Sequence, residues 1–228
     1  MPARRLPESS ATAPGAAAGP FSTPAAPTAA VAALSMPTGR PKRDIVAIGV
    51  STGGPPAVQK ILAALPGDFP AAILIAQHMP AAFTGPFAAR LNNTSAMTVK
   101  EAQNGEKIRT GTVYISPGGQ HLTVRPNLDI VISPEPTSEL YKPSATLLMD
   151  SVGKAFGRKA LGVMLTGMGS DGMEGAKVFK QQGGRLIAQS EQTCVVYGMP
   201  KAVVDAGLAD EVVDLENIPQ AMIAGLFK

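Results

Sequence analysis

The chain has 228 residues, 45% of them hydrophobic, which suits one sizeable domain with a flanking extension. It has no apolar run near the ~20 residues that cross a bilayer and no secretion signal, and its single cysteine, Cys194, excludes an internal disulfide, so we expect a cytoplasmic protein. Residues 1–43 carry five basic residues and one acidic residue, which leaves 15 basic and 16 acidic residues for 44–228 and no basic footprint for nucleic acid.

The first 43 residues are rich in Ala, Pro, Ser and Thr and show neither a helical nor a strand period. Such a composition buries too little apolar surface to offset the entropy lost on ordering. We therefore predict a disordered tail at residues 1–43 and a folded domain at 44–228.

A buried strand is predicted at residues 45–50, where β-branched and apolar residues run together. It stops at Ser51 within the sequence GVSTG, and a helix is predicted at 57–65. Gly-x-Ser-x-Gly between a strand and a helix is typical of a nucleophile elbow. An anion-binding turn or a plain tight turn are the alternatives, although the turn lacks the lysine of a P-loop and the glycine spacing of a dinucleotide site.

Further along the chain, predicted strands alternate with predicted helices. The alternation favours an α/β fold with a doubly wound, mostly parallel sheet, helices on both faces and a small hairpin. The further strands are expected at 71–76, 98–103, 111–116, 121–125, 128–133, 161–166, 185–189 and 211–213, and the further helices at 83–91, 144–156, 173–182, 200–206 and 218–227.

Three polar residues, Ser51, His78 and Asp171, each follow an apolar run that we expect to be a strand. Parallel strands would place all three at the carboxyl edge of the sheet, where ligands of such folds bind. A serine hydroxyl needs a base to take its proton, a histidine can do so, and a carboxylate can orient that histidine. The three residues together therefore predict acyl-transfer chemistry.

Each residue also has a simpler interpretation. His78 alone would suit a structural hydrogen bond, and Asp171 could only cap the helix that starts at Met173. His121 is a rival base, although it enters a predicted polar hairpin, and Cys194 is expected to be a core thiol. The histidines and the cysteine lack the spacing of a metal site, and the order Ser, His, Asp disfavours a standard α/β-hydrolase.

With these motifs the sequence resembles the catalytic domain of the chemotaxis protein-glutamate methylesterases, the CheB family, over roughly residues 44–225. The resemblance is carried by IGVSTGG at 48–54, QHMP at 77–80 and LTGMGSDG at 165–172. Weaker support comes from VKEA at 99–102, CVVYGMP at 194–200 and EVVDL at 211–215.

The resemblance implies an esterase that removes methyl groups from glutamate γ-methyl esters on the cytoplasmic helices of chemoreceptors, releasing methanol, and that deamidates certain glutamines there. Ser51 would be the nucleophile, His78 the base and Asp171 the orienting carboxylate, while the backbone amides of Thr52 and Met168 would bind the oxyanion. It implies no metal and no organic cofactor. Other chemotaxis-type signalling proteins are further possible partners, and membrane insertion is not expected.

Two features depart from the family pattern. Only residues 1–43 precede the domain, too few for the receiver domain that many members carry, so we do not expect phosphorylation control within this sequence. The family's Arg-Pro-Ser-Val-Asp is replaced by KPSAT at 142–146, which we expect to alter an edge of the cleft. A catalytically silent module that binds receptors or signalling proteins is the main alternative, and nucleotide binding at the glycine-rich turn is a lesser one.

Overall fold

The computed structural model describes Leu34 and residues 36–228, so most of the predicted tail, residues 1–33 and Ser35, lies outside the described residues. Within the rest of that stretch, Leu34 and Met36 pack against the hydrophobic core, and the Arg43 guanidinium donates to the carbonyls of Gly225 (2.8 Å) and Lys228 (2.7 Å). Contacts with the folded domain therefore begin before the predicted boundary at residue 44.

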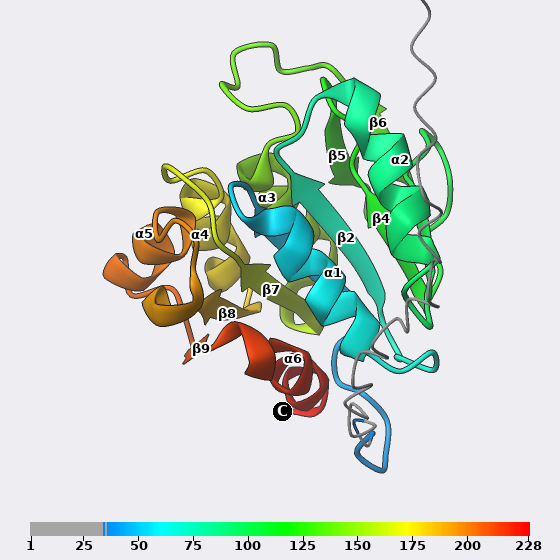
Figure 1. Ribbon diagram of the computed structural model, residues 1–228, viewed down its shortest axis with the longest axis vertical. Helices are drawn as coiled ribbons and strands as arrows, with labels where there is room; N and C mark the ends of the chain where they lie inside the picture. The colour runs from blue at the N-terminus through cyan, green and yellow to red at the C-terminus, as the bar shows by residue number, and fades with distance from the viewer. Residues whose placement is uncertain (1–33, 35) are drawn as a thin grey trace, which may run out of the picture. The chain divides into compact units, whose positions relative to one another are not determined.

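Strands and helices alternate along the described chain, as the apolar pattern predicts, except over residues 98–133, where four strands follow one another (Figure 1). The strands are β1 (Ile45–Val50), β2 (Ala72–Gln77), β3 (Thr98–Glu101), β4 (Thr112–Ile115), β5 (His121–Val124), β6 (Ile130–Ser133), β7 (Ala160–Met164), β8 (Arg185–Gln189) and β9 (Glu211–Val213). The helices are α1 (Gly54–Ala64), α2 (Ala81–Asn92), α3 (Ala145–Phe156), α4 (Met173–Gln181), α5 (Met199–Asp205) and α6 (Ile218–Phe227), with 3₁₀ turns η1 (Gly157–Lys159), η2 (Glu191–Thr193) and η3 (Leu215–Asn217).

The seven strands of the main sheet run in the order β3-β4-β2-β1-β7-β8-β9, and every neighbouring pair is parallel. Strands β5 and β6 form a separate antiparallel hairpin. The predicted doubly wound parallel sheet with a small hairpin is thus confirmed. The chain moves from β1 to β2 on one side and later returns to β7 on the other, so the order reverses at β1. In such sheets a ligand crevice opens beyond the carboxyl ends of the strands at that reversal.

Helices cover the sheet on both faces (Figure 1). Alternate residues of β1 point to opposite sides: Val46 and Ile48 join the core under α1, α2 and α6, while Ile45 and Ala47 join the core under α3, α4 and α5. Since every residue of β1 is buried, the continuous apolar run read in the sequence marks a central strand.

Some boundaries differ from the prediction. Helix α1 begins at Gly54, ahead of the predicted residue 57, because Pro55 and Pro56 fit its first turn, where a missing N–H costs nothing. Helix α2 begins at Ala81, ahead of the predicted residue 83, and contains Pro86. None of the helices in the described residues combines the length and apolarity needed to cross a bilayer.

Candidate active site

Ser51 lies in the tight turn between β1 and α1, at the strand where the sheet order reverses. Gly53 adopts φ +81°, and an added Cβ would come within 2.6 Å of Val195 Cβ, so only glycine fits there. The Ser51 amide donates to the carbonyl of Thr166 (3.0 Å), and Gln77 Nε2 donates to the carbonyl of Ser51 (3.0 Å). The serine backbone is therefore held by β2 on one side and by the loop after β7 on the other.

His78 follows β2, the strand beside β1. Val50 and Gln77 are register partners, and the His78 amide donates to the carbonyl of Val50 (3.1 Å). Gln77 Nε2, which holds the Ser51 carbonyl, also donates to the carbonyl of His78 (3.1 Å). One buried carboxamide therefore ties the serine turn to the histidine loop.

Asp171 reaches the same edge from the loop after β7. His78 Nε2 lies 2.7 Å from its Oδ2, and the side chains of His78 and Asp171 are only 10% and 5% exposed. Oδ2 also accepts from the amide of Ala145 (2.7 Å), while Oδ1 accepts from the amide of Thr146 (3.0 Å) and the hydroxyl of Ser144 (3.1 Å). Asp171 thus receives donors from the first turn of α3 as well as from the imidazole.

Burial by itself would raise the pKa of Asp171. The hydrogen bonds from His78, the Ala145 amide and Thr146 outweigh burial and bring the pKa down to about 2. The carboxylate is therefore ionised throughout the neutral range and sits at the N-terminus of α3, where the helix dipole favours negative charge.

The two ring nitrogens of His78 have different surroundings. Nε2 is paired with the carboxylate of Asp171, whereas Nδ1 is buried and has no hydrogen-bond partner among the described residues, the Ser51 hydroxyl included. With the proton on Nε2 facing Asp171, Nδ1 carries the free lone pair, so it is the nitrogen that can act as a base. The structure thus joins His78 to Asp171 and places Ser51 on the adjacent strand end without a hydrogen bond to the ring.

Thr52 and Met168 were predicted to supply backbone amides. Thr52 is exposed beside Ser51 at the start of α1, and Met168 is 65% exposed in the loop after β7. The two loops touch, since a Cβ added to Gly167 would lie 2.8 Å from Ser51 Cβ. Among the described residues neither amide donates a backbone or side-chain hydrogen bond within the protein, so both are available to an external oxygen.

Thr166 supports the site in a way that the sequence analysis missed. Its buried hydroxyl donates to the carbonyl of Thr52 (2.9 Å) and accepts from the amides of Val195 (3.1 Å) and Val196 (3.0 Å). It thereby locks the segment 194–200 against the serine turn. A polar residue at the end of an apolar run could have indicated this role in the sequence. Gln77 is such a residue at the end of β2, and Thr166 is one at the end of the run 161–166.

The rival interpretations fare differently. Asp171 accepts from the amides of α3, whereas α4, which the sequence suggested it might cap, has Gly172 at its N-cap. His121 was expected in a polar hairpin but is 1% exposed; its Nδ1 accepts from the Ser144 amide (3.2 Å), and its Nε2 lies 3.3 Å from the Pro136 carbonyl. Both of its nitrogens are engaged away from Ser51.

Burial raises the pKa of the Cys194 thiol to about 11, so this side chain is a neutral thiol at ordinary pH. Within the part of the chain that the structure describes, no group of three or more His, Cys, Asp or Glu side chains is placed to share a metal ion.

The changed sequence at 142–146 was expected to alter an edge of the cleft, and in the structure this segment donates the hydrogen bonds that hold the Asp171 carboxylate. Ser144 caps α3 through its hydroxyl, which accepts from the Leu147 amide, and Thr146 Oγ1 accepts from the Gly172 amide (2.8 Å). Thr146 stands where the resembling family has an aspartate, and its hydroxyl fixes the backbone directly after Asp171.

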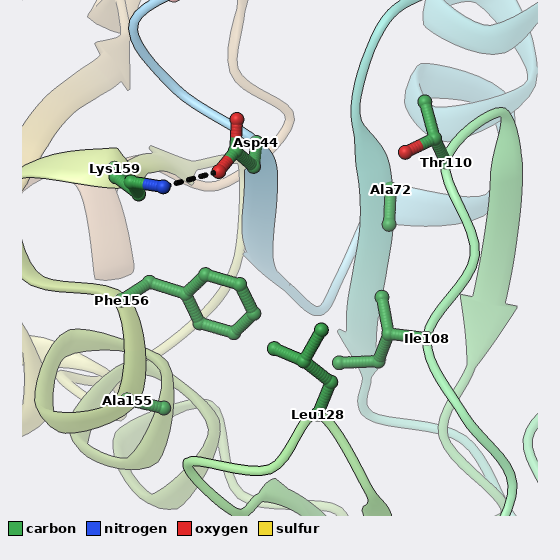
Figure 2. Close-up of a pocket in the computed structure, with 8 residues that line it drawn as sticks. All are labelled: Asp44, Ala72, Ile108, Thr110, Leu128, Ala155, Phe156 and Lys159. Atoms are coloured by element: carbon green, nitrogen blue, oxygen red, sulfur yellow. Dashed lines mark ion pairs between the residues drawn. The ribbon is translucent and has the colours of Figure 1, made fainter.

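A separate cavity of about 380 Å³ opens at the opposite, amino edge of the sheet (Figure 2). Phe156, Leu128 and Ile108 form its apolar wall, and an ion pair between Lys159 and Asp44 (3.2 Å) lies at one side. Asp44 precedes β1 and Ser51 follows it, so the length of the strand separates this cavity from the serine turn.

Comparison with known proteins agrees with this geometry. The model of the CheB methylesterase family matches residues 46–222. A protein-glutamate methylesterase/protein-glutamine glutaminase of Nitratidesulfovibrio vulgaris is 66% identical over 82% of this chain and 52% of its own length, and one of Oleidesulfovibrio alaskensis is 61% identical over 86% and 54%. The crystal structure of the Thermotoga maritima CheB methylesterase catalytic domain superposes with a TM-score of 0.77 at 42% identity, covering 80% of this chain and 98% of that one.

The chain spans about half the length of the curated relatives it matches, and the matched half corresponds to the catalytic domain of the solved structure. The family model covers most of the folded part, from β1 into α6. The chain therefore belongs to the CheB methylesterase family.

Proposed function

We propose that this chain is a serine hydrolase that demethylates glutamate γ-methyl esters of chemoreceptors and deamidates receptor glutamines. The observation that carries the proposal is the buried pair of His78 Nε2 and Asp171 Oδ2, 2.7 Å apart, in the loops that follow the two strands beside β1. The names of the relatives, which combine methylesterase with glutaminase, support both reactions.

In the first step Ser51 Oγ attacks the ester carbonyl and His78 Nδ1 takes the hydroxyl proton. Rotation of the serine side chain toward Nδ1 precedes the attack, because hydrogen bonds of this kind often tighten only when substrate is bound. Asp171 stays ionised and stabilises the imidazolium through Nε2. In the serine-protease template Nε2 is the base and Nδ1 donates to the aspartate, so in this site the two ring nitrogens would exchange these roles.

The attacked carbonyl oxygen becomes an oxyanion, which we assign to the amides of Thr52 and Met168. The Thr52 amide lies at the N-terminal end of α1, where partial positive charge gathers. Collapse of the tetrahedral intermediate breaks the carbon–methoxy bond, and the proton on Nδ1 moves to the leaving oxygen, so methanol departs and a glutamyl ester of Ser51 remains.

Water completes the cycle. His78 Nδ1 takes a proton from water as its oxygen attacks the acyl-enzyme, and the proton then returns to Ser51 Oγ, leaving a glutamate carboxylate. A glutamine would follow the same path with ammonia as the leaving group. We place this reaction in the cytoplasm, on the methylation helices of chemoreceptors, and propose residues 44–228 as the catalytic unit.

The test is methanol release from methylated receptor membranes. Ser51→Ala should lower turnover by roughly 10³-fold or more, because a triad without its nucleophile retains only the residual effects of binding and the oxyanion site. Thr110→Ala, which removes an exposed hydroxyl at the opposite, amino edge of the sheet, serves as the control and should keep wild-type turnover.

A catalytically silent receptor-binding module, the alternative, predicts receptor binding without loss of ester and no labelling of Ser51 by a serine-directed phosphonate. No observation favours it. Methanol release that is equal in wild type and Ser51→Ala would refute the proposed reaction.

A further inference from the structure

Tyr141 lies face to face with the imidazole of His78. The ring centroids are 4.4 Å apart and the ring planes differ by only 6°. Tyr141 belongs to the loop between β6 and α3, so it approaches His78 from a different part of the chain than Asp171 does. The carboxylate meets the imidazole at its edge, at Nε2, and the phenol ring covers one of its faces.

The loop that carries Tyr141 is tied down on both sides of the residue. The Gly119 amide donates to the carbonyl of Lys142 (3.1 Å), Lys142 Nζ donates to the carbonyl of Pro134 (3.0 Å), and His121 Nε2 reaches the carbonyl of Pro136 (3.3 Å). These hydrogen bonds therefore hold in place the loop that carries the aromatic ring.

The phenol end of Tyr141 reaches the loop that carries Met168 and Asp171. Gly169 adopts φ +80°, and a Cβ added there would lie 3.3 Å from the Tyr141 hydroxyl oxygen. The ring thus spans from the histidine to this loop, where the glycine at 169 leaves room for the phenol oxygen.

Stacking of this kind affects the two protonation states of His78 differently. An aromatic face carries partial negative charge, which attracts a cation placed over it, and the attraction strengthens where water is excluded. The His78 side chain is 10% exposed, so its face is largely shielded from water. The ring becomes a cation only while it holds the proton taken from Ser51 or from water, and so the contact favours the transition state over the resting state.

We propose that Tyr141 is a positioning residue for the hydrolysis: its ring face fixes the plane of the His78 imidazole and stabilises the imidazolium that forms during proton transfer. This inference rests on the proposed function, because it assigns Tyr141 a part in the same reaction. The ring face carries the effect, and the hydroxyl group is dispensable.

The experiment compares Tyr141→Ala with Tyr141→Phe in the full chain, measuring kcat and KM for methanol release over a range of about pH 5 to 9. In Tyr141→Ala, kcat should fall roughly 3- to 30-fold with KM unchanged. The acid limb of the pH–rate profile should move to lower pH by about 0.5 to 1 pH unit, because a less stabilised imidazolium loses its proton sooner. Tyr141→Phe should match wild type in all three quantities.

Leu140→Ala is the matched control, since Leu140 is the adjacent loop residue, is 84% exposed and lies outside the stack; it should leave the acid limb in place. Tyr141→Leu, with the melting temperature of each variant, distinguishes loss of the stack from loss of the fold. An unchanged kcat and acid limb in Tyr141→Ala would overturn the proposal. So would a rise in KM alone, which would make Tyr141 a substrate contact, or a Phe variant as impaired as Ala.

A second readout is independent of ester hydrolysis. The chain has two histidines, so NMR titration of their ring protons in wild type and Tyr141→Ala, assigned with a His121→Asn variant, follows His78 directly. The midpoint for the His78 signals should move to lower pH in Tyr141→Ala. If wild type hydrolyses no ester, the proposed function fails while this titration still decides the role of the stack.

Discussion

Asp171 shows how one side chain serves both the fold and the site. Its two oxygens accept from the Ser144 hydroxyl and from the amides of Ala145 and Thr146, so donors at the start of α3 hold the carboxylate independently of His78. Oδ2 then lies 2.7 Å from His78 Nε2. Because the donors of α3 are part of the folded chain, the carboxylate needs no rearrangement when the imidazolium forms, which is the condition for electrostatic preorganisation.

Replacing Asp171 with Asn tests both tasks. The variant should lower kcat by roughly 10³- to 10⁴-fold, because an amide can hold the imidazole in the wrong tautomer and carries no charge. It should also destabilise the fold at neutral pH by on the order of 2 kcal/mol, since folding lowers the pKa of Asp171 from 3.8 to about 2.

That stabilisation depends on pH in a defined direction. It is complete above the ordinary pKa of 3.8 and is lost as pH falls toward the folded-state pKa of about 2. Denaturant unfolding of wild type and Asp171→Asn across acid pH should therefore show the gap in unfolding free energy closing below about pH 4. If the unfolding free energies of the two proteins instead keep a constant difference across this pH range, the carboxylate is not held by these donors.

At the scale of elements, the N-terminus of α3 is the junction on which the site depends. Ser144 caps the helix, the first-turn amides hold Asp171, and the Ser144 amide itself donates to His121 Nδ1 (3.2 Å). His121, at the start of β5, also reaches the Pro136 carbonyl, so the hairpin, the loop with Tyr141 and α3 meet at one buried imidazole. His121 thereby acts on the site through the backbone, at a distance from Ser51.

We predict that His121→Leu destabilises the fold by about 1–3 kcal/mol, because it leaves the buried Ser144 amide without an acceptor. His121→Asn is the matched variant, since its side-chain oxygen can take the place of Nδ1. Comparing the melting temperatures of the two variants at about pH 7.5 checks the prediction.

Wild type adds a pH test of the same contact. Burial lowers the pKa of His121, partly offset by the Pro136 carbonyl, and Lys142, Glu139 and Asp171 are the charged groups around it. Its stabilising contribution is complete above the ordinary value of 6.5 and declines as pH falls below it. The decline should be absent in His121→Asn; if both proteins lose stability equally toward about pH 5.5, His121 is not the group responsible.

The sequence predicted what depends on local pattern. The apolar runs predicted β1, β2 and β7, and their carboxyl ends pointed to Ser51, His78 and Asp171. Contacts between residues far apart in the sequence could not be predicted. No local pattern around Tyr141 indicates that it stacks on His78, and none around His121 indicates that it is buried. The predicted starts of α1 and α2 were late, because a helical spacing of apolar residues does not mark a first turn, and in α1 that turn contains Gly54, Pro55 and Pro56.

At the scale of the whole domain, the predicted site and the segment that leads into β1 lie at opposite edges of the sheet. Ser51, His78 and Asp171 follow carboxyl ends of strands, whereas the segment leading into β1 is attached at the amino edge. There the Lys42 amide donates to the carbonyl of Leu226, and Arg43 binds the last turn of α6. Since β1 lies between them, we expect changes in the leading segment to affect stability and to leave the serine turn in place.

Two deletions test this separation. Removing residues 1–43 should keep methanol release within about twofold of wild type, because no contact described at the Ser51 edge is lost. It should lower the melting temperature by roughly 2–8 °C, because the partly buried Leu34 and Met36 and the Arg43 hydrogen bonds are removed, a loss of about 1–3 kcal/mol. Removing only residues 1–33 keeps those three side chains and, if that part is the predicted disordered tail, should leave both the melting temperature and the turnover unchanged. A large loss of turnover in either deletion would show that the catalytic unit extends beyond residues 44–228.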